Sequence, residues 1–308
     1  MRKSLLFSLM LATPLALSVI TVSCGGFTSQ PSDPAAADAT SNTAPEASSE
    51  TDGAVDGGFG APVLVRRAPP GQLLAVRPNA LGTDFFTSEG TIDQQFMYRS
   101  ASAGNRGERI EVTDAGGPLF GLAPTPLTIG GTSIIVYGTI GYLSQARIIG
   151  TIADSRIIVD TKIDGGGGSY PYVIPNGTAL YFSAYGELYR CVFNIFSGCA
   201  STTVLTIRSS DSTPVANPNF AVVSPDEQTL YFAGPGLTSL SRIWVATRAT
   251  SASNEVVFEH AEPLAFPDSD KNDSPMWVSP DGKLIYFVRS EAGADGGTDA
   301  IVYSISRP

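Results

Sequence analysis

The only histidine of this 308-residue chain, His260, is the side chain best suited to act as the general base of a nucleophilic triad. It stands in residues 258–263, which read F-E-H-A-E-P and place it between two acids at the end of an apolar run. No G-x-S-x-G motif in a strand–turn–helix context accompanies it. We therefore expect a surface or structural role for His260. For the protein as a whole, we expect no catalytic residues, no cofactor and no enzymatic activity.

Asp268, Asp270 and Asn272 place oxygen atoms at alternate positions of an acidic loop, as the opening of a calcium-binding loop does. The rest of that pattern is missing. Lys271 interrupts the run, no glycine stands at the sixth position, and Ser279 stands where the bidentate glutamate belongs. We therefore expect a solvated loop, with a metal site at the three residues as the alternative.

Cys191 and Cys199 are the only cysteines after Cys24. Two cysteines and one histidine do not complete the four-ligand set of a structural zinc site. In an oxidising compartment, an even pair separated by a short segment predicts a local disulfide bond. The flanking apolar residues predict a hairpin, in which antiparallel neighbours come within disulfide reach. We expect the bond to serve the fold, with two free thiols as the alternative.

The N-terminus carries Arg2 and Lys3, then an apolar run, then Ser23 and Cys24. A basic start, an apolar middle and small residues before a cut are typical of a secretory signal. The cysteine at the cut resembles the lipobox of bacterial lipoproteins, which implies a signal peptide at residues 1–23 and lipidation of Cys24. Gly25 follows where an aspartate would retain an enterobacterial lipoprotein in the inner membrane. This favours the outer membrane, with the protein facing the periplasm or the cell surface. An ordinary signal peptide with an unmodified cysteine is the alternative.

Residues 24–58 are expected to form a disordered acidic tether. The segment carries six acidic residues, no lysine or arginine, and few large apolar side chains. Such a composition buries too little apolar surface to offset the entropy lost on ordering. The following residues, 59–308, hold 23 acids and 17 basic residues. This negative balance disfavours nucleic acid and anionic lipid, so we expect membrane contact only through the N-terminal lipid.

A repeated unit organises residues 59–308. Its clearest copy, residues 276–288, reads M-W-V-S-P-D-G-K-L-I-Y-F-V, in which two apolar runs flank a tight turn. Related turns align positions 82, 131, 177, 227 and 282, at intervals of 49, 46, 50 and 55 residues. The residues expected to shape the three clearest turns are Pro175, Asn176, Gly177, Ser224, Pro225, Asp226, Ser279, Pro280, Asp281 and Gly282. A period near fifty residues with several short strands per period predicts a propeller.

The first four periods each supply four strand candidates and the last supplies three, which predicts an all-β fold, a single β-propeller of four-stranded blades. The last period ends at Pro308 without a fourth strand, whereas Val63, Leu64 and Val65 precede the first period without a blade of their own. We expect this N-terminal strand to complete the last blade and close the ring, which hides two sheet edges. Five blades are expected for residues 59–308, with six as the alternative.

The segments S-P-D-G-K-L-I-Y-F from Ser279 and S-P-D-E-Q-T-L-Y-F from Ser224 resemble the WD40-like Pro-Asp repeat. That repeat occurs in TolB-type periplasmic proteins and in the propellers of prolyl-oligopeptidase-type enzymes. The resemblance implies that Asp226 and Asp281 form turns and do not act in catalysis.

We expect a non-catalytic binding or scaffolding module for protein or glycan partners in the bacterial cell envelope. Two alternatives stay open, because a fold alone does not decide a function. One is a propeller enzyme of hydrolase or lyase type with an unrecognised site in its funnel. The other is a purely structural envelope lipoprotein.

Overall fold

A computed structural model describes residues 58–308, except residues 81, 92–93, 102, 104–109, 115–116, 140–141, 150–151, 161–168, 237–239, 251–254, 270 and 293–297. The chain divides into two compact units, Met1–Gly53 and Ala54–Pro308, and the second holds all the described residues. The predicted signal peptide, the lipidation of Cys24 and residues 24–57 of the predicted tether lie outside the described residues. Among the described residues, no helix has the length and apolar character that a membrane crossing requires.

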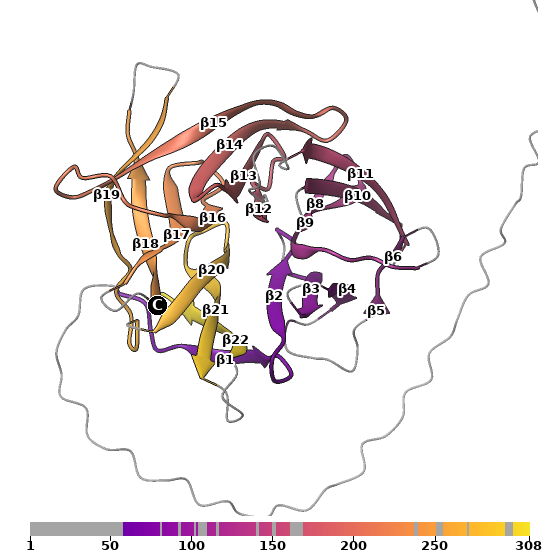
Figure 1. Cartoon of the computed structure of the whole chain (residues 1–308), viewed down its shortest axis with the longest axis horizontal. Coiled ribbons are helices and arrows are strands. Elements are labelled where there is room, and N and C mark those ends of the chain that lie inside the picture. The colour runs from indigo at the N-terminus through magenta and orange to yellow at the C-terminus, as the bar shows by residue number, and fades with distance from the viewer. Residues whose placement is uncertain are drawn as a thin grey trace, which may run out of the picture. The chain divides into compact units, whose positions relative to one another are not determined.

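The described residues contain twenty-two strands and no helix, so the fold is all-β, as predicted. The inner strands are β2 (Leu73–Pro78), β8 (Leu122–Ile129), β12 (Ser169–Val173), β16 (Asn219–Val223) and β20 (Asn272–Val278). Each contacts the next one along the chain, and β20 contacts β2. They therefore surround the middle of the domain, with the other strands farther out (Figure 1).

Outward from the inner strands, each hairpin continues in antiparallel order. The second strands are β3 (Phe85–Gly90), β9 (Thr132–Thr139), β13 (Ala179–Ala184), β17 (Thr229–Pro235) and β21 (Leu284–Ala292). The third strands are β4 (Gln95–Ser100), β10 (Tyr142–Ile149), β14 (Glu187–Asn194), β18 (Ser241–Arg248) and β22 (Thr298–Ser306). The outermost strands are β5 (Ile110–Glu111), β11 (Ile152–Asp160), β15 (Gly198–Ser209), β19 (Val256–Pro263) and β1 (Val63–Arg67). Four-stranded antiparallel units arranged in this way are the blades of a β-propeller.

A tight turn joins each inner strand to its second strand, and each turn has a left-handed residue at the aligned position; the turn between β8 and β9 has a second one at Gly130, with φ of 57°. The left-handed residues at the aligned position are Gly82, Gly131, Gly177, Glu227 and Gly282, with φ of 68°, 78°, 72°, 58° and 71°. These are the five positions that the sequence repeat aligns. Glycine adopts positive φ without a steric penalty, which explains why it stands at four of the five positions.

The strand register is the same in all five hairpins. The residue five positions before the left-handed one pairs with the residue four positions after it. The residues five positions before are Arg77, Pro126, Tyr172, Val222 and Trp277. They occupy one structural position, which we call the inner repeat position.

Serine and aspartate side chains hold the two Pro-Asp turns. Ser279 Oγ donates a hydrogen bond to Asp281 Oδ1 (2.5 Å) and accepts one from the Leu284 N–H (2.9 Å). Ser224 Oγ donates to Asp226 Oδ1 in the same way (2.6 Å). The bond from serine is the main reason why the pKa of each aspartate is lowered. Both carboxylates are therefore engaged inside their own turns.

Two features of the sheets were not predicted from the sequence. The outer strands β15 and β19 pair in parallel, which joins the third and fourth sets of strands into one eight-stranded sheet. The short strands β6 (Thr113–Asp114) and β7 (Gly117–Pro118) extend the second set to six strands. By contrast, β1 pairs antiparallel with β22, the pairing that the sequence predicts for this N-terminal strand. The number of blades and the closure of the ring stay predictions.

The predicted disulfide bond joins Cys191 on β14 to Cys199 on β15, with their Cα atoms 5.7 Å apart. The two strands form a hairpin in which a register shift follows Val192 and Phe193 pairs with Cys199. The bond therefore fastens the closed end of a hairpin, as a disulfide that serves the fold would.

Glu227 connects the third and fourth sets of strands. Its Oε2 accepts hydrogen bonds from Arg190 Nε on β14 (2.7 Å) and from Arg248 Nη1 on β18 (3.2 Å). The hydroxyl of Tyr181 on β13 also donates to it. Burial alone would raise the pKa of Glu227, but the bonds from Arg190 and Tyr181 and the two positive charges outweigh burial and lower it.

Candidate binding cavity

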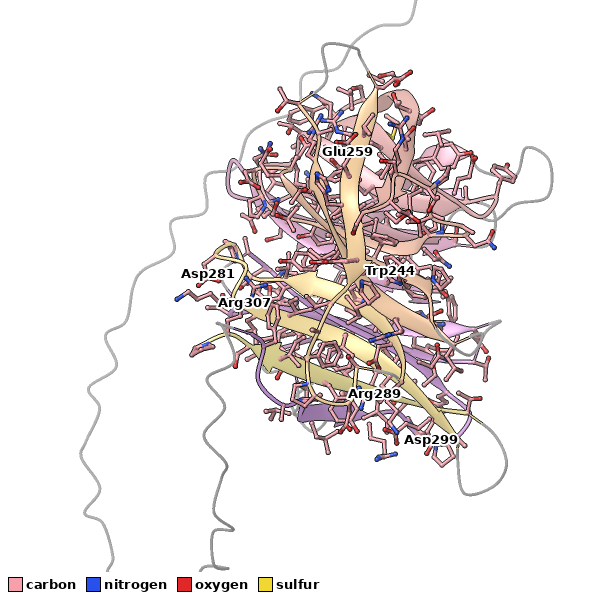
Figure 2. All side chains as sticks on the ribbon, turned by 90° about the vertical axis from the view of Figure 1, so that its left-hand side faces the viewer. Trp244, Glu259, Asp281, Arg289, Asp299 and Arg307 are labelled. Atoms are coloured by element: carbon pink, nitrogen blue, oxygen red, sulfur yellow. A yellow bond between two sulfur atoms is a disulfide. The ribbon has the colours of Figure 1, made fainter. Side chains whose placement is uncertain are left out.

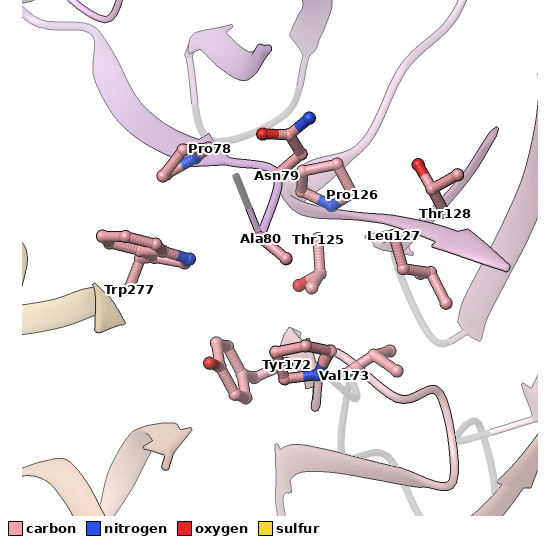
Figure 3. A pocket seen from close by; sticks show the side chains of 11 residues that line it. Pro78, Asn79, Ala80, Thr125, Pro126, Leu127, Thr128, Tyr172, Val173 and Trp277 are labelled. Carbon is pink, nitrogen blue, oxygen red and sulfur yellow. The ribbon is translucent and has the colours of Figure 1, made fainter. Parts of the chain in front are cut away.

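A cavity of about 360 Å³ lies at the ends of the inner strands (Figure 3). Its lining comes from four of these strands and from the turns after β2 and β12, in segments about fifty to one hundred residues apart. The lining residues are Pro78, Asn79, Ala80, Thr125, Pro126, Leu127, Thr128, Tyr172, Val173, Pro175 and Trp277. The repeat thus brings together side chains that are distant in the sequence.

The described lining is mostly apolar and carries two aromatic rings. Trp277, Tyr172 and Pro126 all stand at the inner repeat position. Trp277 also packs on Tyr286 of the next strand, with ring centroids 5.6 Å apart, so its orientation is fixed by the core. Rigid aromatic side chains of this kind supply large contact areas at a small entropic cost.

A few polar groups stand within this apolar lining. The hydroxyl of Thr125 donates to the carbonyl of Pro171 (2.6 Å), and Asn79 accepts from the Thr83 N–H (3.0 Å). Burial raises the pKa of Tyr172, so its phenol stays neutral and can donate a hydrogen bond. An apolar pocket with a small number of placed polar groups is typical of a ligand site.

Arg77, the residue of β2 at the inner repeat position, lies beside the cavity and is completely buried. Its Nη1 donates to the carbonyls of Ala123 (3.1 Å) and Pro171 and to the hydroxyl of Thr125. Its guanidinium carbon lies 5.8 Å from the centroid of the Tyr172 ring. Among the described residues, its Nε and Nη2 atoms have no hydrogen-bond partner.

The charge of Arg77 is therefore poorly compensated. Burial lowers its pKa to about 10, and the neighbouring Tyr172 only partly opposes this effect. The guanidinium remains protonated at neutral pH, so a positive charge is held inside the domain by neutral acceptors alone.

A second cavity of about 90 Å³ lies toward the beginnings of the same strands. Ala75 lines this cavity and Pro78 lines the larger one, so Arg77 stands between the two along β2. Tyr170 and Phe220, which also line the smaller cavity, stack with ring centroids 3.7 Å apart. Both have positive φ, of 56° and 53°, next to bulges in β12 and β16. Bulges of this kind redirect side chains, here toward each other across adjacent inner strands.

The residues that the sequence marked for acid–base or metal chemistry lie away from the cavity lining. His260 is an exposed residue of β19. The Asp268 carbonyl accepts a hydrogen bond from Arg289 Nη2 (2.8 Å), and Asn272 Oδ1 accepts one from the Ser241 N–H (3.1 Å). Asp270 lies outside the described residues. In the described parts of the chain, no group of three or more acids, cysteines or histidines is placed to hold a metal ion.

Sequence reasoning treated Tyr172 and Trp277 as strand residues and did not propose them, or Arg77, as a site. A signal was nevertheless present. The repeat alignment places all three at the same distance from their turns, and an inner-strand residue just before the turn faces the axis of a propeller. An arginine at a position otherwise held by apolar residues was the available clue.

Comparisons with known proteins give only distant structural similarity. No family model matches the chain, and no curated protein matches it. The structure is similar to TolB from Acinetobacter baumannii, with a TM-score of 0.46, 16% identity, and coverage of 76% of this chain and 54% of that chain. A puromycin-hydrolyzing peptidase of Mycobacterium tuberculosis gives a TM-score of 0.45, 11% identity, and coverage of 79% and 39%.

A putative TolB from Agrobacterium tumefaciens gives a TM-score of 0.40 and 17% identity, over 77% of this chain and 91% of that chain. This chain thus spans about half of the Acinetobacter TolB chain and two fifths of the peptidase chain. Similarity at this level gives no ground for transferring a function.

Proposed function

We propose that this protein is an envelope lipoprotein whose propeller binds a protein or glycan partner, without catalysis, through the cavity at the ends of the inner strands. The observation that carries the proposal is the lining itself, in which Trp277 and Tyr172 stand among prolines and a few hydroxyl and amide groups. Such a lining offers stacking, apolar contact and directed hydrogen bonds. Its described residues include no acid, histidine, lysine or cysteine that would transfer a proton or attack a bond.

The location is part of the same proposal. Lipidated Cys24 would hold the protein on the outer membrane, and residues 24–58 would let the domain reach partners on the periplasmic side or at the cell surface. Intact-mass measurement of the mature protein tests the anchor. We expect a chain that begins at Cys24 and carries acyl groups, whereas an unmodified N-terminus would contradict it.

Blocking the cavity tests the binding function. Ala80 is an exposed lining residue, so Ala80→Tyr should fill the cavity entrance without disturbing the core. Ala265→Tyr is the matched control, because Ala265 is also exposed and does not line the cavity. Each protein is cross-linked in envelope extracts, and the captured partners are quantified by mass spectrometry.

We expect at least one partner to be lost with Ala80→Tyr and retained with Ala265→Tyr. Equal capture by all three proteins would contradict the cavity as the binding site. The alternatives make other predictions. If the protein is a propeller enzyme, the wild-type protein should consume a substrate that the Ala80→Tyr variant does not consume. If it is a purely structural lipoprotein, it should capture no partner whose binding depends on the cavity.

A further inference from the structure

Among the described residues, the two other buried arginines are paired with carboxylates. Arg289 donates to Asp273 at 2.7 and 2.9 Å, and Arg66 lies 2.6 Å from Glu89. Arg77 is buried as deeply as these two, but its hydrogen-bond acceptors are two backbone carbonyls and a hydroxyl. Among the described residues, it is thus the buried arginine for which no carboxylate partner is found.

A buried guanidinium without a counter-charge loses the favourable free energy of hydration. Hydrogen bonds to neutral groups replace only part of that free energy. A carboxylate is the group that compensates it best, because its two oxygens match two parallel N–H donors. Nε and Nη2 of Arg77, the edge that usually forms such a pair, are the atoms without a partner. An anion supplied from outside the chain would therefore complete this site.

The cavity places such an anion within reach. Thr125 and Tyr172 both line the cavity and both contact Arg77. Arg77 shares the inner repeat position with Trp277, whose ring also lines the cavity. Thr125 and Tyr172 thus connect the cavity lining directly to the Arg77 side chain.

We infer that Arg77 is the receptor for a carboxylate and that the cavity takes the C-terminal residue of a peptide chain that ends in an apolar or aromatic side chain. The carboxylate accepts hydrogen bonds from Nε and Nη2 of Arg77, the two atoms of that side chain without a partner among the described residues. The apolar side chain lies against Trp277, Pro126 and Leu127. A polar acidic sugar fits this lining less well, because most of the lining atoms offer it no hydrogen bond. This inference rests on the proposed binding function and narrows its ligand class.

Fluorescence of Trp277 provides the test. The chain has two tryptophans, and Trp244 lies on β18, outside the cavity lining (Figure 2). A Trp244→Phe protein therefore reports on the cavity alone. It is titrated with N-acetyl-L-phenylalanine, with the uncharged N-acetyl-L-phenylalaninamide, and with glucuronate. The first two ligands differ only in the charged terminal group.

We expect the acid to bind at least about tenfold more tightly than the amide, which corresponds to one charge-assisted pair. In Trp244→Phe/Arg77→Met the preference for the acid over the amide should fall below about twofold, because the positive charge that distinguishes the two ligands is absent. If the Arg77 variant does not fold, the affinities of the Trp244→Phe protein for the acid and the amide still test whether the cavity prefers a carboxylate.

Three results would overturn the inference. Equal affinity for acid and amide would mean that the cavity binds apolar groups and that Arg77 is no receptor, which leaves the proposed binding function intact. Glucuronate binding as tight as that of the acid would replace the peptide terminus with an acidic sugar. Binding of none of the three ligands would remove the carboxylate site, and the Ala80→Tyr capture experiment would then decide separately whether the cavity binds a partner.

Discussion

Arg289 in the last set of strands and Arg77 in the first are both buried, but they differ in the groups that accept their hydrogen bonds. Arg289 is labelled in Figure 2 and lies on β21. It donates twice to Asp273, which has 0% exposure. Arg77 lies on β2 with 0% exposure and donates only to neutral oxygens. A paired charge of this kind holds the fold together, whereas an unpaired one is suited to a ligand.

The largest effect that we expect from this difference is in the Arg289→Met variant. It removes the two hydrogen bonds that Arg289 donates to the buried carboxylate of Asp273, so the free energy of unfolding should fall by about 3–5 kcal/mol. Denaturant unfolding measures this change. Arg67→Met is the control, because Arg67 is 51% exposed and its bridge to Asp299 at 3.5 Å should contribute no more than about 1 kcal/mol. Equal losses in the two variants would remove the contrast between buried and exposed pairs.

Loss of the disulfide bond should lower the free energy of unfolding by an amount between those expected for Arg289→Met and Arg67→Met. A Cys191→Ser/Cys199→Ser variant should still fold, with its unfolding free energy lowered by at most roughly 2–3 kcal/mol, because the bond closes a short loop. Thermal melting of the variant beside the oxidised wild-type protein measures the difference. A variant that loses binding of its partner at unchanged stability would instead indicate a reactive thiol pair.

A smaller and pH-dependent effect is expected at Glu227, a carboxylate that is paired but only partly buried. Its pKa in the folded protein is lowered from 4.5, so its pairing with Arg190 and Arg248 stabilises the fold above the pKa of the unfolded chain. That stabilisation is lost as the pH falls from about 4.5 through the lower folded pKa. The melting temperature of Glu227→Gln should thus lie below that of wild type at neutral pH, by the equivalent of about 1 kcal/mol, and approach it in acid. Exposed Glu262→Gln is the control, and a gap that stays constant with pH would contradict the account.

The smallest effect on stability is expected at Arg77 itself. Arg77→Met removes three hydrogen bonds but also removes an uncompensated buried charge, and no carboxylate is left behind. We therefore expect the free energy of unfolding to change by less than about 1 kcal/mol. A loss as large as that of Arg289→Met would show that Arg77 is a structural residue.

The sequence predicts the strands of this fold far better than it predicts the cavity. Each strand prediction of the repeat depends on local chemistry, such as that of Ser279 and Asp281, which form hydrogen bonds within their own turn. The disulfide was predictable for the same reason, since its two cysteines are eight residues apart. By contrast, the parallel pairing of β15 with β19 leaves no local pattern, because parallel partners are distant in sequence.

The cavity is harder to foresee because its parts come from different repeats. Arg77 stands in the first repeat, whose turn has neither the serine nor the aspartate of the later ones. Its significance depends on Thr125 and Tyr172, about fifty and one hundred residues away, which only folding brings together with it. His260 and Asp268, which were considered for acid–base and metal chemistry, were expected to have a surface or structural role and a place in a solvated loop, and both lie outside the cavity lining.

The most direct test is a crystal structure of the domain with N-acetyl-L-phenylalanine. We predict density in the cavity with the carboxylate within hydrogen-bond distance of Arg77 Nε and Nη2, about 2.7–2.9 Å, and with the phenyl ring beside Trp277. An empty cavity, or a ligand whose carboxylate points to solvent while Arg77 keeps its present partners, would contradict the account.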